Sequence, residues 1–174
     1  MSPIRVGAVL LAAGASAACL ARFGLSARSL VGVPFICVLA ALAAIDLETR
    51  LLPNRIVLPA TVLFLLAQIA LFPDQALEWI AAALLAALVF VIPALISPRA
   101  FGMGDVKVLL LLGVVLGRAV GFAIFVASFV GLLFALAVLR RDGRGALKST
   151  IPFGPALAVG GIVALLVDED RPVL

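Results

Sequence analysis

The sequence predicts an all-α fold, a polytopic transmembrane helical bundle with about six to seven spanning helices. Of the 174 residues, 66% are hydrophobic and only 13% are charged, whereas a water-soluble domain is roughly half apolar and a quarter charged. The polar side chains are too few to cover a soluble particle of this size, so the apolar residues are expected to face lipid. The apolar residues also form segments of helix length, separated by Pro, Gly and charged residues.

Seven apolar segments are candidates for spanning helices, because a span takes roughly 20 mostly apolar residues and fewer inside a bundle. They are Ile4–Ala21, Leu30–Leu47, Ile56–Phe72, Leu77–Ile96, Val106–Leu116, Ala119–Leu139 and Pro152–Val167. The fifth is short, and only Gly117-Arg118 divides it from the sixth, so the two can instead form one bent or re-entrant unit. The connecting loops leave no room for a soluble domain. Residues 1–174 are therefore expected to form a single integral-membrane domain.

The basic residues predict the orientation, because cytoplasmic loops carry more Lys and Arg. With the N-terminus in the cytoplasm, nine basic residues lie on that side and four on the other. The nine are Arg5, Arg50, Arg55, Arg99, Lys107, Arg140, Arg141, Arg144 and Lys148; the four are Arg22, Arg28, Arg118 and Arg171. This count favours an N-terminus in the cytoplasm and a C-terminus outside, and we expect a multi-pass protein of the plasma or inner membrane. The alternative for residues 4–21 is a cleavable signal sequence, but six further apolar segments favour a retained helix.

The composition excludes several kinds of chemistry. Histidine is absent, which rules out a Ser-His triad, a His general base and a His-ligated zinc. The two cysteines, Cys19 and Cys37, lie in apolar runs and form no C-x-x-C pair, so we expect no metal and no cofactor. The basic residues are scattered among membrane loops, which favours topology over nucleic-acid binding. The run from Arg140 to Lys148 is expected to be an anchor in contact with membrane lipid.

Two aspartates lie near the ends of predicted helices, on the same predicted side of the membrane. Asp46 lies in the last turn of the second segment, seven residues before a Pro53 that stops a helix. Asp105 follows Gly102-Met103-Gly104, a pattern that allows positive φ and close approach to another chain segment. Each has a simpler alternative: Asp46 as an interfacial group paired with Arg50, and the Asp105 loop as a helix cap.

Two carboxylates in one site can hydrolyse an amide without a metal, a histidine or a nucleophilic side chain. They do not ionise together easily, so one keeps its proton and the pair titrates as a unit. The charged one can take a proton from an attacking water, and the protonated one can donate to the carbonyl oxygen. Glu48 is a less suitable member, since two residues along a helix it points to the opposite side from Asp46.

At these residues the sequence resembles the type IV prepilin peptidases, membrane aspartic peptidases of the Gly-x-Gly-Asp class. Three stretches carry the resemblance: Asp46 with Pro53-Asn54, then Gly102-Met103-Gly104-Asp105-Val106-Lys107, then Ile151-Pro152-Phe153-Gly154-Pro155. The resemblance implies that Asp46 and Asp105 are the catalytic residues. It also implies that the other motif residues shape the site: Pro53, Asn54, Gly102, Gly104, Lys107, Pro152, Gly154 and Pro155. The implied substrate is a pilin-like precursor, whose short basic leader is cut at the cytoplasmic membrane face.

One departure from the family changes the expected activity. Larger members carry a cytoplasmic domain with two C-x-x-C pairs and also N-methylate the trimmed pilin, whereas this sequence has only two cysteines. We therefore expect cleavage without methylation and without zinc, as in a compact form found with pilus or related secretion systems.

Two other functions remain open from the sequence. One is an intramembrane protease of the presenilin or signal peptide peptidase type, since Pro155-Ala156-Leu157 spells the Pro-Ala-Leu motif of that group. However, Ile45 stands where that group usually has Tyr, and Lys107 and the Pro53-Asn54 spacing favour the prepilin branch. The other is a non-catalytic membrane scaffold or an ion transporter. A transporter would be expected to place its acids near the midplane and to show an internal repeat.

Overall fold

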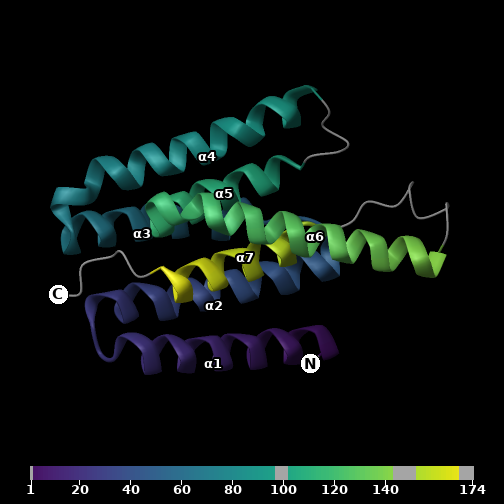
Figure 1. Ribbon diagram of the computed structural model, residues 1–174, viewed down its shortest axis with the longest axis horizontal. Helices are drawn as coiled ribbons and strands as arrows, with labels where there is room; N and C mark the ends of the chain where they lie inside the picture. Colours follow the sequence, from purple (N-terminus) through teal and green to yellow (C-terminus); the bar gives the residue numbers. More distant parts are fainter. Residues whose placement is uncertain (1, 97–101, 143–151, 169–174) are drawn as a thin grey trace.

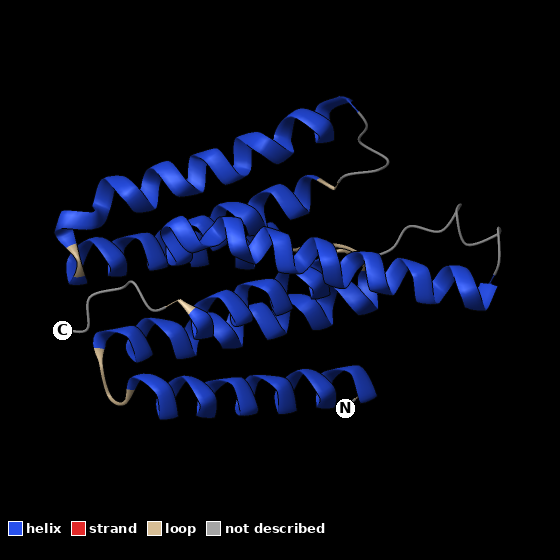
Figure 2. Cartoon of the chain, viewed as in Figure 1, coloured by secondary structure: helices blue, strands red, loops and turns tan. Residues whose placement is uncertain are grey.

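The structure is a computed structural model that describes residues 2–96, 102–142 and 152–168. The described residues form seven α-helices and two short 3₁₀ turns (Figure 2). The helices are α1 (Pro3–Phe23), α2 (Ala27–Thr49), α3 (Asn54–Leu71), α4 (Ala76–Ile96), α5 (Met103–Leu116), α6 (Val120–Asp142) and α7 (Gly154–Val167). The turns are η1 (Pro73–Gln75) and η2 (Gly117–Ala119). The predicted all-α class is confirmed.

Successive helices run in alternating directions along the long axis of the molecule (Figure 1). The C-terminus of α2 and the N-termini of α3, α5 and α7 consequently lie at one end of the bundle, which we call the aspartate end because it carries Asp46 and Asp105. The opposite end, where α1, α3, α5 and α7 finish, is called the far end. This alternation brings motifs that are distant in sequence to one place.

Among the described residues, five stretches are long and apolar enough to cross a membrane. They are Pro3–Phe23, Ala27–Thr49, Asn54–Leu71, Pro73–Ile96 and the combined α5–α6 stretch Met103–Arg141. Both α5 and α7 have 14 residues, about 21 Å of helix, which is short of the roughly 30 Å hydrocarbon core. Most of their residues are buried against other helices, so neither has to match the lipid thickness alone.

The boundary between α5 and α6 is a sharp reversal at Gly117. Its φ is +55°, a conformation that glycine adopts freely. A Cβ at this position would lie 2.8 Å from Cζ3 of Trp79 and 3.0 Å from Oε1 of Glu78. The two helices are therefore separate and antiparallel (Figure 1), which decides between the two possibilities that the sequence left open.

Basic residues are more numerous at the aspartate end than at the far end. Among the described residues, six lie at the aspartate end, namely Arg5, Arg50, Arg55, Lys107, Arg140 and Arg141, and three at the far end, namely Arg22, Arg28 and Arg118. Arg99, Arg144, Lys148 and Arg171 lie outside the described residues. The asymmetry has the direction expected from the sequence, and the assignment of the aspartate end to the cytoplasm stays a prediction.

Candidate active site

Asp46 lies in the last turn of α2 and is almost completely buried, with 5% of its surface exposed. Its Oδ2 accepts a hydrogen bond of 2.9 Å from the backbone N–H of Gly154, the first residue of α7. The N-terminal end of a helix carries a partial positive charge and unpaired N–H groups, which suits a carboxylate. No ion pair joins Asp46 to Arg50 in the described part of the chain. The simpler interpretation of Asp46, as an interfacial group paired with Arg50, therefore lacks its ion pair.

The Pro-Phe-Gly-Pro segment fits closely around Asp46. A Cβ on Gly154 would lie 2.6 Å from Oδ2 and 2.9 Å from Cγ of Asp46, so no other residue fits here without movement. Pro155 stands in the first turn of α7, where a fixed φ and a missing N–H are tolerated. Pro152 is half-buried just before the helix. Together these residues bring the start of α7 onto the carboxylate.

Phe153 is a residue of this segment that the sequence analysis did not single out. A Cβ on Gly131 of α6 would lie 2.9 Å from Cε2 of the Phe153 ring. The ring therefore packs on the α6 backbone directly before Gly154. A bulky residue inside the motif and a glycine in a predicted helix are both visible in the sequence. That Phe153 packs on Gly131 depends on the tertiary structure and could not be predicted.

Asp105 lies in the first turn of α5 and is partly buried. The helix begins at Met103, three residues earlier than the predicted start at Val106, with Gly102 as its N-cap. Neither glycine of the motif uses the positive φ that the pattern allows; among the described glycines, Gly24 and Gly117 have positive φ. The reason is that Gly102 has the extended conformation (φ −75°, ψ 135°) that any N-cap residue can adopt.

The expected close approach of the Gly-x-Gly motif is confirmed at Gly104. A Cβ there would lie 3.0 Å from Cβ and 3.1 Å from Cδ1 of Leu52, in the connection between α2 and α3. One turn of α5 is thereby packed directly on the chain that follows Asp46. A second link stands beside it: Nζ of Lys107 donates a hydrogen bond of 2.6 Å to Oδ1 of Asn54, the first residue of α3. Pro53, the N-cap of α3, stands between these two contacts.

These contacts place the two aspartates in one site. The carboxylate of Asp105 lies within electrostatic range of that of Asp46. Leu52–Gly104 and Asn54–Lys107 hold the chain after Asp46 on the first turn of α5, and the N–H of Gly154 holds the Asp46 carboxylate itself. Seen together, the three motifs supply one carboxylate pair and the backbone that supports it.

Glu48, a third carboxylate near this end of α2, has other partners. Glu48 accepts hydrogen bonds from Nε of Arg5 at 3.1 Å and Nη2 of Arg5 at 2.9 Å, and from the Ser2 hydroxyl at 2.5 Å. It therefore faces α1 rather than Asp105, in agreement with the expectation that it is a less suitable member of the pair. Within the described ranges, no group of three or more His, Cys, Asp or Glu side chains could hold a metal ion.

The fold and the site define an integral membrane helical bundle that brings two carboxylates together at one end. The type IV leader peptidase family matches residues 33–136, a stretch that contains both aspartates and the helices between them. The chain belongs to the type IV leader peptidase family.

Curated relatives support this membership. The relatives from Bacillus subtilis, Pseudomonas putida and Burkholderia pseudomallei are each named prepilin leader peptidase/N-methyltransferase. The protein from Bacillus subtilis (strain 168) is 35% identical over 156 residues, covering 86% of this chain and 60% of the relative. The one from Pseudomonas putida is 32% identical, covering 86% and 54%, and the one from Burkholderia pseudomallei (strain 1026b) is 33% identical, covering 89% and 52%. The chain thus spans little more than half the length of these relatives. No solved structure matches it.

Proposed function

We propose that this chain is a membrane aspartic endopeptidase that removes the short basic leader from type IV pilin-like precursors. The observation that carries the proposal is the convergence of Asp46 and Asp105 at one end of the bundle, with the N–H of Gly154 on the Asp46 carboxylate. The printed names of the relatives supply the substrate class, a prepilin with a leader. The bilayer is the other partner, because the helices expose apolar side chains such as Leu85 and Phe125.

The proposed reaction uses the two aspartates as one acid–base unit. The ionised carboxylate takes a proton from a water molecule as its oxygen attacks the carbonyl carbon of the scissile amide. The protonated carboxyl donates to the carbonyl oxygen, which gives a tetrahedral diol. When the C–N bond breaks, one diol proton returns to a carboxylate and the leaving amine takes a proton from the other carboxyl. Each cycle thus leaves one proton on the pair, as at the start.

The cleavage is proposed to occur at the cytoplasmic face of the plasma or inner membrane. Its support is the excess of basic residues at the aspartate end, six against three among the described residues, because positive loops stay in the cytoplasm. Cysteine accessibility measured at single introduced cysteines tests this orientation. A cysteine at Arg55 should be protected from an impermeant reagent added outside the cell, and one at Arg118 should react.

A non-catalytic scaffold is the competing function, and reconstitution separates the two. The purified chain is placed in liposomes with a pilin-like precursor, and the product is analysed by N-terminal sequencing and mass spectrometry. The double variant Asp46→Asn/Asp105→Asn, similar in shape but lacking both titrating groups, is the control. Trimming by wild type alone supports the peptidase, and an unmethylated product fits cleavage alone. If several precursors stay intact with wild type, the scaffold function replaces the peptidase.

A further inference from the structure

The connection between α2 and α3 contains an unusual backbone conformation at Arg50. This residue directly follows α2 and has φ +55° and ψ +28°, in the left-handed region. Among the described residues other than glycine, it alone has positive φ. A side chain is uncommon in this region, which glycine usually occupies at the end of a helix. Strained backbone of this kind is kept mainly where the surrounding structure holds it and function uses it.

The turn at Arg50 is held by hydrogen bonds to the last turn of α2. The backbone N–H of Arg50 donates a hydrogen bond of 2.8 Å to the carbonyl oxygen of Asp46. The hydroxyl of Thr49 donates to the carbonyl oxygen of Ile45 at 2.8 Å and lies 3.3 Å from that of Leu51. These contacts end α2 one turn after Asp46 and direct the chain toward α3.

The residues after this turn contact the start of α5. A Cβ on Gly104 would lie 3.0 Å from the Cβ of Leu52, and Oδ1 of Asn54 accepts a hydrogen bond of 2.6 Å from Nζ of Lys107. Arg50 therefore lies between the helix that carries one aspartate and the contacts that hold the helix carrying the other. A change of chain direction at Arg50 would move both contacts relative to the end of α2.

The side chain of Arg50 does not account for this conformation. It is exposed, and in the described part of the chain it forms no ion pair with Asp46. An exposed basic side chain at this end of the bundle does not need a left-handed backbone, since Arg55 lies within α3. The backbone of Arg50, and not its charge, is thus the property that bears on the site.

We propose that Arg50 is a positioning residue, whose left-handed backbone sets the distance between the carboxylates of Asp46 and Asp105. The inference rests on the proposed peptidase function and adds a residue to it. It makes activity depend on the backbone preference at position 50 and not on the charge there. Glycine and asparagine adopt the left-handed region readily, alanine does so less readily, and a β-branched residue such as valine least.

Cleavage of a pilin-like precursor by reconstituted protein is the first test. Arg50→Gly and Arg50→Asn lack the charge and should cleave at the wild-type rate, as should Arg50→Lys. Arg50→Val should lower kcat about tenfold or more with KM unchanged, because displaced catalytic groups lose up to about 100-fold. Arg50→Ala should fall between them, and it carries the comparison if Arg50→Val does not fold.

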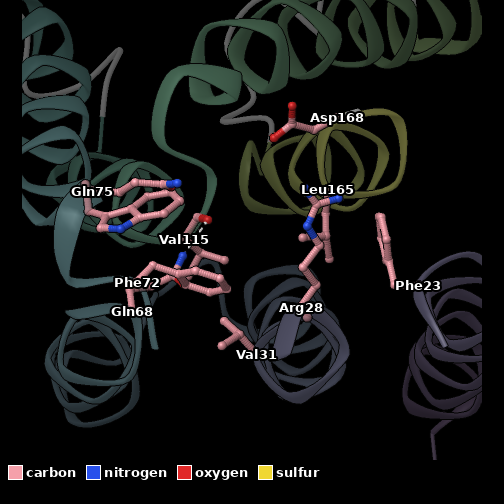
Figure 3. A pocket seen from close by; sticks show the side chains of 11 residues that line it. Phe23, Arg28, Val31, Gln68, Phe72, Gln75, Val115, Leu165 and Asp168 are labelled. Carbon is pink, nitrogen blue, oxygen red and sulfur yellow. Dashed lines mark hydrogen bonds between the residues drawn. The ribbon is translucent and has the colours of Figure 1, made fainter. Parts of the chain in front are cut away.

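The width of the pH profile separates positioning from loss of stability. Carboxylates that lie farther apart repel each other less, so the two limbs of the bell should move closer together in Arg50→Val. The control is Gln68→Met at the far end, where the buried Gln68 donates from Nε2 to the carbonyl oxygen of Val115 at 3.0 Å (Figure 3). This variant should lower the Tm and leave the width of the bell unchanged.

A distance measurement tests the same geometry without cleavage. Spin labels are attached at Leu51→Cys and Met103→Cys, whose native side chains are 72% and 46% exposed, in a chain with Cys19→Ala and Cys37→Ala. Dipolar broadening in the continuous-wave EPR spectrum then reports the distance between the connection and the first turn of α5. Arg50→Gly should keep the wild-type broadening, and Arg50→Val should reduce it.

The outcomes also separate this inference from the proposed function. The positioning role is overturned if Arg50→Val and Arg50→Ala keep the wild-type rate and the wild-type broadening. It is equally overturned if Arg50→Gly and Arg50→Asn lose activity while Arg50→Lys keeps it, which would assign the role to the charge. If wild type cleaves no precursor, the peptidase function fails, and the spin-label distances alone decide whether position 50 sets the geometry.

Discussion

The backbone N–H of Gly154 donates a hydrogen bond of 2.9 Å to Oδ2 of Asp46, across 108 positions of sequence. It joins the start of α7 to the end of α2 and fixes one carboxylate of the proposed pair. The contact depends on the absence of a side chain at position 154. Gly154 thus supports the site by geometry as well as by hydrogen bonding.

Replacing Gly154 by alanine is expected to lower the cleavage rate roughly 100-fold, because the new Cβ displaces the Asp46 carboxylate and misplaced catalytic groups lose about that much. The rate is measured on a pilin-like precursor with reconstituted protein. Gly121→Ala is the matched control, since a Cβ at that helical position meets nothing within 4 Å. A Gly154→Ala variant as active as Gly121→Ala would remove the proposed role of Gly154.

Lys107 and Asn54 are expected to act as one unit that positions Asp105. Lys107→Met and Asn54→Ala should each lower the cleavage rate several-fold, mainly in kcat, and the double variant should be little worse than either one. The coupling expected for a partly exposed charged hydrogen bond is about 1 kcal/mol. Arg55→Met, which removes a neighbouring exposed basic residue, should have little effect. Strictly additive losses from Lys107 and Asn54 would contradict the link.

Cleavage is expected to depend on pH in a bell shape. At low pH both aspartates are protonated and no base is left, and at high pH both are ionised and no acid is left. The two limbs belong to the pair and not to single residues. Initial rates across the acid and neutral range, with the folded state checked at each pH, provide the test. A rate that rises steadily with pH would point to a single base instead.

Gly117→Ala is expected to destabilise the fold. The substitution places a side chain at φ +55° and 2.8 Å from the Trp79 ring, and a strained backbone of this kind costs about 1 to 3 kcal/mol. Thermal unfolding in detergent should show a lower Tm than for wild type, with Gly121→Ala close to wild type. An unchanged Tm would mean that the α5–α6 reversal does not depend on glycine.

Much of the fold could be predicted from the sequence because the bilayer imposes simple rules. Apolar segments of helix length and the Pro and Gly residues between them located every helix found in the structure. The starting point of α5 was missed by three residues, because the apolar run begins at Val106 whereas the helix begins directly after its N-cap, Gly102. The burial of α5 and α7 inside the bundle could not be predicted, because it is a tertiary property.

The site was predictable in its residues but not in its contacts. Asp46, Asp105 and the Pro-Phe-Gly-Pro motif could be identified in the sequence, and the alternating directions of the helices place them at one end of the bundle. The pairing of Lys107 with Asn54, the packing of Leu52 on Gly104 and the placing of Phe153 on Gly131 depend on how the helices pack. The burial of Arg28 at the far end also depends on helix packing. In the sequence, Arg28 counted only as one of the basic residues that indicate the topology.

The two-aspartate mechanism is tested most directly by the rates at which Asp46→Asn, Asp105→Asn and Glu48→Gln cleave a pilin-like precursor. Glu48 is the matched control, because it is a carboxylate two residues from Asp46 that pairs with Arg5. Each Asn variant should insert in the membrane and lose cleavage by about 100-fold to 10,000-fold, and Glu48→Gln should stay within a few-fold of wild type. If either Asn variant cleaves at the wild-type rate, the two-carboxylate mechanism is wrong.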